Sequence, residues 1–514
     1  MKQNAFLSFF ALISLSITLK AVSPNIILIF IDDMGWRDVG FSGEEIAETP
    51  SLDHYAKQGI VFANAYASAP NCAPSRACLL SGQYTPRHGV YTVVDERHAP
   101  GSAHHKILAA KSNESMPTEV VTLAEVMKKG GYTTACLGMW NLGRGKNSPV
   151  TPTGQGFDLF RRPQDYGYEK HRYQKDDGSY LADDFTDEAI SFIDKAKDQP
   201  FFVYLPYHSI HAPFEPPAEL LSKYESKLKK TGNSDEDPGY LATVESLDRN
   251  VGRLMRHLEE KGLEQKTTIF FTSDNGGGFR GNAPLRQGKG SLYEGGIRMP
   301  SLVSGPGIKK GSYCNVPVVQ WDFLQTFYDL AGGTDPLPKD LDGGSLRDVF
   351  QRGNKGRVKR NTKELIFHFP WHTGVAESVI RSGKYKLRKD LDSLNIELFD
   401  ISKDLSEEND LAADMPDLVR KLDQKRAKYL KEVNAETVTL TRRNYVELLE
   451  GGWIENGRNR LAKLKAEMIR DPSNKQKAFQ VGVSQNHVDF QDKQLERSKR
   501  LIQMHEDRGT ANKN

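Results

Sequence analysis

Residues 25–35 read Asn-Ile-Ile-Leu-Ile-Phe-Ile-Asp-Asp-Met-Gly. The uninterrupted apolar run from Asn25 to Ile31 predicts a central parallel strand that is buried on both faces. Asp32 and Asp33 follow directly, so they stand at the carboxyl end of this strand, where open α/β sheets place their ligands. Two adjacent carboxylates repel each other, and a bound cation would offset that cost. Taken alone, the same dipeptide would be an ordinary solvated turn.

Apolar strands and amphipathic helices alternate along the chain up to about residue 350. Strands are expected at Val61–Tyr66, Tyr132–Leu137, Phe201–Leu205 and Thr267–Thr272, and helices at Leu123–Lys129, Tyr240–Leu258 and after Cys72, with a further helix start at Thr49–Asp53. Polar clusters recur where these strands end. The alternation predicts an α/β fold, a doubly wound and mostly parallel sheet formed by one domain over residues 24–350.

The pattern changes after the basic, glycine-containing segment 351–360, which is expected to be a linker. Short strands at Glu364–Phe369, Ser378–Arg381 and Lys384–Arg388, followed by a helix over Pro416–Lys431, predict a small C-terminal α+β subdomain at residues 361–431. Residues 432–514 are polar and are expected to form a largely helical extension.

The N-terminus carries an apolar run, residues 5–19, behind Lys2, and Ala21 follows as a cleavage residue. The run is too short to span a membrane, so residues 1–21 are expected to be a secretory signal peptide; a buried N-terminal helix is the alternative. The protein is then expected in the periplasm or outside the cell. No later segment is long and apolar enough for a membrane span.

Composition excludes several functional classes. The chain has 514 residues, of which 27% are charged, with a net charge of +3. A balance this close to neutral argues against a protein that wraps nucleic acid. Four cysteines, at 72, 78, 136 and 314, are too few for a disulfide framework in an exported chain of this length.

Residues 72–76 read Cys-Ala-Pro-Ser-Arg, and the residues after them, Ala77–Gly82, resemble the start of a helix, which would place Cys72 near its N-terminus. Backbone N–H groups at a helix N-terminus favour anions, and Arg76 offers a rigid fork of donors that suits a tetrahedral oxyanion. A cysteine at this point is unusual only because of these neighbours, since an isolated Cys72 would usually be a core thiol.

Other polar residues complete an inventory suited to hydrolysing an anionic ester. Hard oxygen ligands at two strand ends favour Ca²⁺ or Mg²⁺ over zinc: Asp32, Asp33, Asp274 and Asn275. Such an ion could polarise an ester oxygen and lower the pKa of a bound hydroxyl. Lys289 lies among glycines that would let a substrate approach, and His211 could protonate a leaving alkoxide. Each of these residues alone would pass for a surface or turn residue.

The order of these motifs resembles the type I, formylglycine-dependent sulfatases of the alkaline-phosphatase-like superfamily, over roughly residues 24–425. The matching stretches are Ile31–Gly35, Thr49–Asp53, Cys72–Arg76, Arg87–Gly89, His211–Pro213, Thr272–Gly276, Leu285–Arg298, Lys384–Leu387 and Glu397–Asp400. The resemblance implies an alkaline-phosphatase-like fold with a smaller C-terminal subdomain beside the pocket.

The resemblance also implies a mechanism. A formylglycine-generating enzyme would oxidise Cys72 to formylglycine, and one hydroxyl of its hydrate, held near Arg76, would attack sulfur. His211 would protonate the leaving alcohol, Lys289 would bind the sulfate, and loss of the second hydroxyl's proton would release it. One Ca²⁺ (or Mg²⁺) would be bound by Asp32, Asp33, Asp274, Asn275 and the modified Cys72.

The sequence departs from the family at residues 138–143, which read Gly-Met-Trp-Asn-Leu-Gly where the family usually has Gly-Lys-Trp-His-Leu-Gly. Met139 cannot make the sulfate contact of the lysine, and Asn141 can donate a hydrogen bond but cannot act as a base. An oxyanion contact of this kind is worth ~3 kcal/mol. Arg144 or Lys146 could supply the missing charge, the substrate could supply its own group, or the protein could bind sulfated ligands without turnover. The retained groups favour a working enzyme.

The substrate expected by family analogy is a sulfated poly- or oligosaccharide. Its contacts are expected to include Asn141, Arg144, Lys146, Arg286, His368 and His372. Trp371 could stack on a sugar ring or pack between the domains. Two other functions compete with this one: a phosphate or phosphonate monoester hydrolase on the same scaffold, and a non-catalytic protein that binds sulfated glycans.

Overall fold

An eight-stranded sheet forms the centre of the computed structural model, in the order β10-β2-β9-β8-β1-β7-β5-β6. All its pairs are parallel except those of β9, which runs antiparallel to β2 and β8. Its strands are β1 (Asn25–Ile31), β2 (Gly59–Phe62), β5 (Thr133–Leu137), β6 (Leu159–Arg161), β7 (Phe201–Tyr207), β8 (Thr267–Ser273), β9 (Ser301–Ser304) and β10 (Ser312–Cys314). The predicted mostly parallel sheet is confirmed.

The structure describes residues 23–93, 107–145, 148–169, 172–196, 199–233, 235–278, 280, 282–371, 376–391, 393–438, 440–441 and 454–470, with scattered positions between 481 and 499. The predicted signal peptide and most of the C-terminal extension lie outside these residues. None of the helices within the described ranges is long and apolar enough to cross a membrane.

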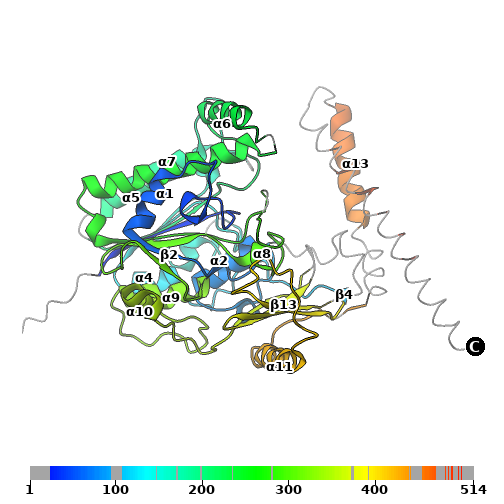
Figure 1. The fold of residues 1–514 in the computed structure, drawn as a ribbon. Coiled ribbons are helices and arrows are strands. Elements are labelled where there is room, and N and C mark those ends of the chain that lie inside the picture. Colours follow the sequence, from blue (N-terminus) through cyan, green and yellow to red (C-terminus); the bar gives the residue numbers. More distant parts are fainter. Residues whose placement is uncertain are drawn as a thin grey trace, which may run out of the picture.

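Helices cover both faces of the sheet (Figure 1). One face carries α1 (Pro50–Gln58), α5 (Leu181–Ala196), α6 (Ala218–Thr231) and α7 (Pro238–Glu260). The other carries α2 (Cys72–Ser81), α4 (Leu123–Lys129), α9 (Phe323–Leu330) and α10 (Arg347–Arg352). Two short helices, α3 (Thr85–His88) and α8 (Glu294–Ile297), lie in the connecting loops.

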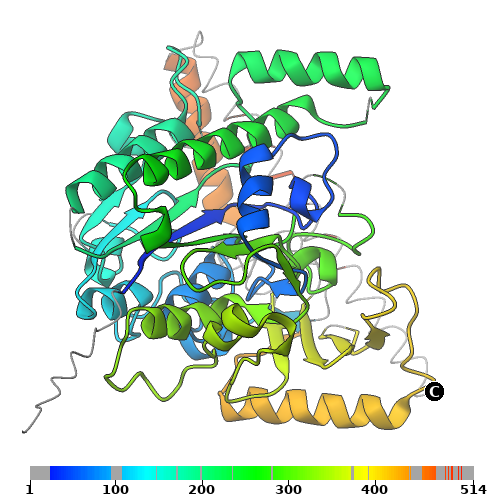
Figure 2. The same ribbon diagram turned by 60° about the vertical axis from the view of Figure 1, so that its left-hand side comes forward.

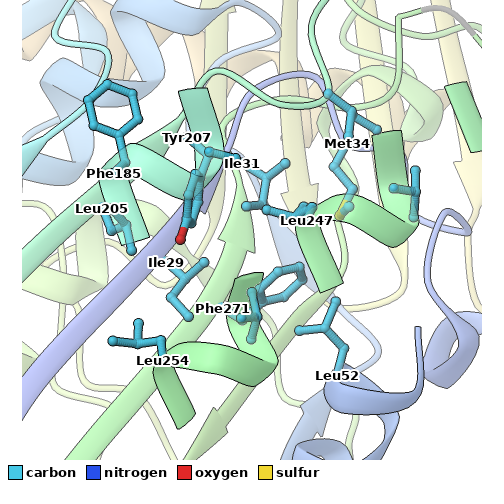
Figure 3. Packing of buried hydrophobic residues seen from close by; sticks show 14 of the residues in the cluster. Ile29, Ile31, Met34, Leu52, Phe185, Leu205, Tyr207, Leu247, Leu254 and Phe271 are labelled. Carbon is cyan, nitrogen blue, oxygen red and sulfur yellow. The ribbon is translucent and has the colours of Figure 1, made fainter. Parts of the chain in front are cut away.

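The position of β1 in the middle of the sheet explains why its sequence is apolar without interruption. Ile27, Ile29 and Ile31 are fully buried under α5 and α7, and the alternate side chains of β1 are fully buried on the opposite face. Figure 3 shows Ile29 and Ile31 packed with Leu205 of β7 and Leu254 of α7. The prediction of a strand buried on both faces is confirmed.

Four neighbouring strands, β8, β1, β7 and β5, end at the same edge of the sheet. Ile31 of β1 is in register with Ser273 of β8 and with Tyr207 of β7. The polar residues that follow these strands are therefore brought side by side, although they are far apart in sequence.

Two local predictions differ from the structure. The strand expected at Val61–Tyr66 is two strands, because the chain turns at Ala63 and Asn64; β3 (Ala65–Tyr66) then pairs with β11 (Val318–Val319). The linker expected at 351–360 begins inside α10, which ends at Arg352 and is anchored by the buried Val349 and Phe350.

The C-terminal part is a four-stranded sheet of β12 (Leu365–Phe369), β13 (Glu377–Ser382), β14 (Tyr385–Asp390) and β15 (Ile396–Asp400), all paired antiparallel. The long helix α11 (Pro416–Glu432) runs beside it (Figure 2). This sheet and the main domain share one apolar cluster, which includes Tyr66, Trp321 and Trp371. The predicted α+β subdomain is confirmed. Beyond it, β16 (Leu440–Thr441) pairs with β4 (Ile107–Leu108), and α13 (Ile454–Arg470) follows.

Candidate active site

Cys72 is buried and is the first residue of α2, so the helix begins at the pentapeptide Cys72–Arg76 and not past it, as was predicted. The side chain of Asn71, the N-cap residue, accepts a hydrogen bond from the Cys72 N–H at 2.8 Å. The Cys72 Sγ atom lies 3.3 Å from Asp32 Oδ1 and 3.9 Å from Asp33 Oδ1. Burial, with the carboxylates of Asp274 and Asp32, raises the pKa of the thiol well above its ordinary value.

The predicted metal ligands meet at the end of the main sheet. One ligand atom from each of Asp32, Asp33, Cys72 and Asp274 lies within 4.8 Å of the others, and all four side chains are buried. Burial and the Asp274 carboxylate raise the pKa of Asp32. Burial also opposes the charge of Asp274, but Arg76 and Lys289 outweigh it and hold the pKa of Asp274 below its ordinary value. The cluster therefore combines excess negative charge with very little solvent.

Two oxygen atoms of the cluster test whether a cation fits. Asp32 Oδ2 and Asn275 Oδ1 are buried and have no hydrogen-bond partner among the described residues. Asn275 donates from Nδ2 to Asp33 Oδ1 at 2.8 Å, and this bond fixes the orientation of its amide. The amide oxygen of Asn275 is therefore held in place as an acceptor. Buried acceptors without donors are costly, and hard oxygens of this kind are ligands for Ca²⁺ or Mg²⁺. The residues present fit such an ion.

Arg76 lies fully buried behind the carboxylates. Its guanidinium is 2.9 Å from Asp274 Oδ2 and 3.5 Å from Asp32 Oδ2. Nη1 donates to the backbone oxygen of Met139 at 3.1 Å. These contacts connect α2 with the ends of β8, β1 and β5, so Arg76 both neutralises the cluster and fixes its geometry.

Lys289 contacts the cluster at Asp33. Its Nζ atom lies 2.6 and 2.7 Å from the two carboxylate oxygens of Asp33. Burial opposes its charge, but Cys72 and the nearby carboxylates outweigh burial and raise the pKa of its ammonium group. The backbone is held as well, because Lys289 N donates to Gly277 O at 3.2 Å and Gly290 N to Pro70 O at 2.8 Å.

His211 stands at the mouth of the site, with 32% of its side chain exposed and Nε2 at 3.7 Å from Asp33 Oδ2. Nδ1 lies 2.6 Å from the backbone oxygen of Ala212. A carbonyl oxygen only accepts, so Nδ1 carries a proton and Nε2 is the nitrogen that can exchange one with a substrate.

Met139 and Asn141, the two departures from the family pattern, contact each other. Asn141 Nδ2 donates to Met139 Sδ at 3.0 Å, and both side chains are half-buried. Asn141 has a φ of 57°, a left-handed conformation that asparagine tolerates better than most residues. The departure is thus one packed local unit beside Arg76.

The remaining predicted substrate contacts have different surroundings. Arg144 is exposed. Arg286 lies over the Tyr293 ring, with Nη1 bonded to the backbone oxygen of Glu407, and 39% of its side chain is exposed. Their substrate roles stay predictions. Lys146 and His372 lie outside the described residues.

His368 is buried in β12, where Nε2 bonds to the Glu436 backbone oxygen at 2.8 Å and burial lowers its pKa to about 4. Its role as a substrate contact stays a prediction. Trp371 is buried in the cluster shared with the main domain, which favours packing over stacking on a sugar.

Sequence reasoning missed two residues that shape the site. Asn71 could have been found had the helix been expected to start at Cys72, since asparagine is a common cap. Gln320 could not. Its side chain donates to Ser273 O at 2.7 Å and accepts from Ser68 N at 2.9 Å, and so joins the end of β8 to the chain before Cys72.

Comparisons with known proteins agree with this geometry. The sequence model described as Sulfatase matches residues 24–333, and the one described as N-sulphoglucosamine sulphohydrolase, C-terminal, matches residues 287–435. A sulfatase of Formosa agariphila is 32% identical over 500 residues, covering 80% of this chain and 90% of the relative. The N-acetylgalactosamine-6-sulfatase of Mus musculus is 31% identical, covering 71% of each chain.

Among solved structures, Ps i-CgsB in complex with k-i-k-neocarrahexaose superposes with a TM-score of 0.67 at 28% identity, covering 79% of this chain and 92% of that chain. Fold, motif order and relatives therefore agree: this chain belongs to the type I sulfatase family of the alkaline-phosphatase-like superfamily, and it is a sulfuric ester hydrolase.

Proposed function

We propose that this sulfatase removes sulfate from a sulfated oligo- or polysaccharide, with formylglycine at position 72 as the nucleophilic residue. The observation that carries the proposal is the position of Cys72. It begins α2, and its Sγ lies 3.3 Å from Asp32 Oδ1. Arg76 pairs with Asp274 and Lys289 with Asp33 in the same cluster. A formylglycine-generating enzyme would act on the chain before it folds around this buried side chain.

The surrounding residues divide the work of ester hydrolysis. Asp32, Asp33, Asp274 and Asn275 would hold one Ca²⁺ or Mg²⁺, which supplies positive charge at a developing oxyanion. Hydrated formylglycine would supply the attacking hydroxyl. Lys289 would bind sulfate oxygens, Arg76 would hold the carboxylates in place, and His211 would give a proton from Nε2 to the leaving sugar oxygen.

A charge count favours sulfate over phosphate monoesters. Three carboxylates, Asp32, Asp33 and Asp274, face the cations of Arg76 and Lys289, and one bound divalent ion would leave the site with one net positive charge. A sulfate monoester carries one negative charge and neutralises it, whereas a phosphate monoester carries two at neutral pH. Because Met139 is uncharged where the family has a lysine, it adds nothing to this net charge of the site.

The carbohydrate substrate is supported by relatives. One is an N-acetylgalactosamine-6-sulfatase, and the structure of another was solved with a bound neocarrahexaose. Export is proposed on the apolar run at residues 5–19. Cell fractionation of chains with and without residues 1–21 tests it, and retention of the full chain in the cytoplasm would refute it.

The deciding experiment is sulfate release from a panel of sulfated mono- and oligosaccharides by protein produced together with a formylglycine-generating enzyme. Conversion of Cys72 is confirmed by peptide mass. We expect release from one group of sugars by the natural chain, complete loss in Cys72→Ala, and near-normal release in Cys314→Ala, a buried cysteine in β10. Release that survives Cys72→Ala would refute the nucleophile, and no release with full conversion would refute the substrate class.

A further inference from the structure

The segment 286–296 carries Lys289 and lies between the main sheet and the C-terminal sheet. On the main-sheet side, three backbone hydrogen bonds hold it, in addition to the ion pair of Lys289 with Asp33 and the Tyr66 hydroxyl, which donates to Glu294 Oε2 at 2.8 Å. Lys289 N donates to Gly277 O at 3.2 Å, Gly290 N to Pro70 O at 2.8 Å, and the Gly296 oxygen accepts from Gly276 N at 2.9 Å. These bonds place the segment against the loops that carry Asn275 and Cys72.

On the other side, three carboxylates from the C-terminal part bind the same segment. Glu377, at the start of β13, accepts from Ser291 Oγ at 3.2 Å and from Leu292 N at 3.0 Å. Glu397 of β15 accepts from the Tyr293 hydroxyl. Glu407 accepts from the backbone N–H of Glu294 at 2.6 Å.

Two cations at alternate positions of β14 hold these carboxylates. Lys386 Nζ lies 2.9 Å from Glu294 Oε1 and 2.8 Å from Glu407 Oε1, with 1% of its side chain exposed. Arg388 Nε lies 2.9 Å from Glu377 and Nη1 2.7 Å from Glu397. Alternate residues of a strand point to the same face, so both cations face segment 286–296.

A buried network of ion pairs does not by itself show that these residues stabilise the fold, because apolar side chains of the same volume often give equal or greater stability. What charged groups add is geometric specificity, because each carboxylate accepts only from donors at defined places. Here the donors lie within five residues of Lys289 on the same segment.

We propose that Lys386 and Arg388 of β14 are positioning residues for sulfate ester hydrolysis: through Glu377, Glu397 and Glu407 they fix the segment that presents Lys289 to the sulfate group. The C-terminal sheet thereby takes part in catalysis without contacting the reacting atoms. This inference rests on the proposed function, because the contact between Lys289 and sulfate is part of that proposal.

A double-mutant cycle tests the proposal. Lys386→Met is made in the natural chain and in Lys289→Ala, and kcat, KM and the affinity for inorganic sulfate are measured for all four proteins. A displaced catalytic group can cost on the order of a hundredfold in rate. We expect Lys386→Met to lower kcat and sulfate affinity by about tenfold or more in the natural chain and to have little further effect when Lys289 is absent.

The matched control is Lys384→Met, the same substitution two residues earlier, at a lysine that is 46% exposed and pairs with Asp400; it should leave kcat and KM unchanged. Lys386→Arg, which keeps the positive charge, should retain most of the kcat and sulfate affinity that Lys386→Met loses. If Lys386→Met fails to fold, Glu377→Gln, which keeps the side-chain shape, replaces it in the cycle. An equal loss with and without Lys289 would overturn the proposal.

The two proposals can fail separately. No sulfate release by the fully converted natural chain would refute the proposed function. The double-mutant cycle would then use the affinity for inorganic sulfate as its readout. Coupling between positions 386 and 289 in that affinity would still support the positioning role, and additive effects would refute it. Normal release with additive effects refutes the positioning role alone.

Discussion

The guanidinium group of Arg76 donates to the carboxylate of Asp274 at 2.9 Å, and neither side chain is exposed to solvent. Arg76 lies on α2, four residues after Cys72, and Asp274 follows β8. The pair therefore joins the helix that carries the proposed nucleophile to the sheet edge that carries the proposed metal ligands.

Replacing Arg76 with methionine should be strongly destabilising. The substitution leaves the buried carboxylates of Asp274 and Asp32 without their cation, and breaking a buried pair in this way costs roughly 3–5 kcal/mol. Urea unfolding in the presence of a chelator, which prevents a divalent ion from compensating, measures the effect. Arg352→Met is the control, because its pair with Asp348 is exposed and is worth about 0–1 kcal/mol. Equal urea midpoints for the two variants would contradict the role given to Arg76.

Much of the site was predictable because its signals are local. The apolar run of β1 predicts both a buried strand and the place where Asp32 and Asp33 emerge. Cys72 precedes a helical pattern, and Asp274 follows another apolar strand. Parallel strands of one sheet end at a common edge, so residues far apart in sequence could be placed together without knowledge of side-chain contacts.

The network behind Lys289 was not predictable in the same way. In the sequence, Lys386 and Glu407 look like surface residues, since most charged side chains are exposed. Only the packing of the C-terminal sheet against segment 286–296 buries them and pairs them. The contacts of Arg286 with Tyr293 and Glu407 could not be predicted either, and its substrate role stays a prediction.

Calcium or magnesium should raise the thermal stability of the protein independently of its activity. An ion that binds only the folded chain adds ~2.7 kcal/mol at a concentration one hundred times its Kd. Differential scanning calorimetry of chelator-treated protein, with each ion added back, measures the shift. Asn275→Ala removes the buried Oδ1 acceptor and should reduce the shift, whereas Asn395→Ala, in an exposed turn of the C-terminal sheet, should keep it. Identical shifts in the two variants would argue against a cation at this place.

Met139→Lys should change the preference of the site among anions. A lysine beside Arg76 adds one positive charge, which attracts a phosphate dianion more than a sulfate monoanion. The difference should be at least about 1 kcal/mol for charges roughly 4 Å apart, or about fivefold in affinity. Binding of a phosphate monoester and of a sulfate monoester of the same alcohol at pH 8, a dianion and a monoanion, measures it, with Met139→Leu as the uncharged control. Parallel changes for both anions would mean that Met139 does not face the sulfate site.

Glu407 should make the stability of the protein depend on pH. Burial, opposed by Lys386 and reinforced by Glu294, raises the pKa of Glu407 to about 7. The folded chain therefore keeps this proton at pH values where the unfolded chain has lost it. Below pH 4.5 both states are protonated and no difference arises; as the pH rises from 4.5 to about 7, stability falls by about 3 kcal/mol and then stays constant.

Comparison of the natural chain with Glu407→Gln isolates this contribution, because glutamine imitates the protonated acid. The two unfolding temperatures should be similar near pH 4.5, and above pH 7 Glu407→Gln should unfold at the higher temperature. Glu408→Gln, the exposed neighbour, controls for a change of net charge. The prediction fails if the difference between the two unfolding temperatures stays constant from pH 4.5 to pH 8. Glu407 would then be ionised throughout this range, and Lys386 would bind two carboxylates, those of Glu294 and Glu407, at every pH.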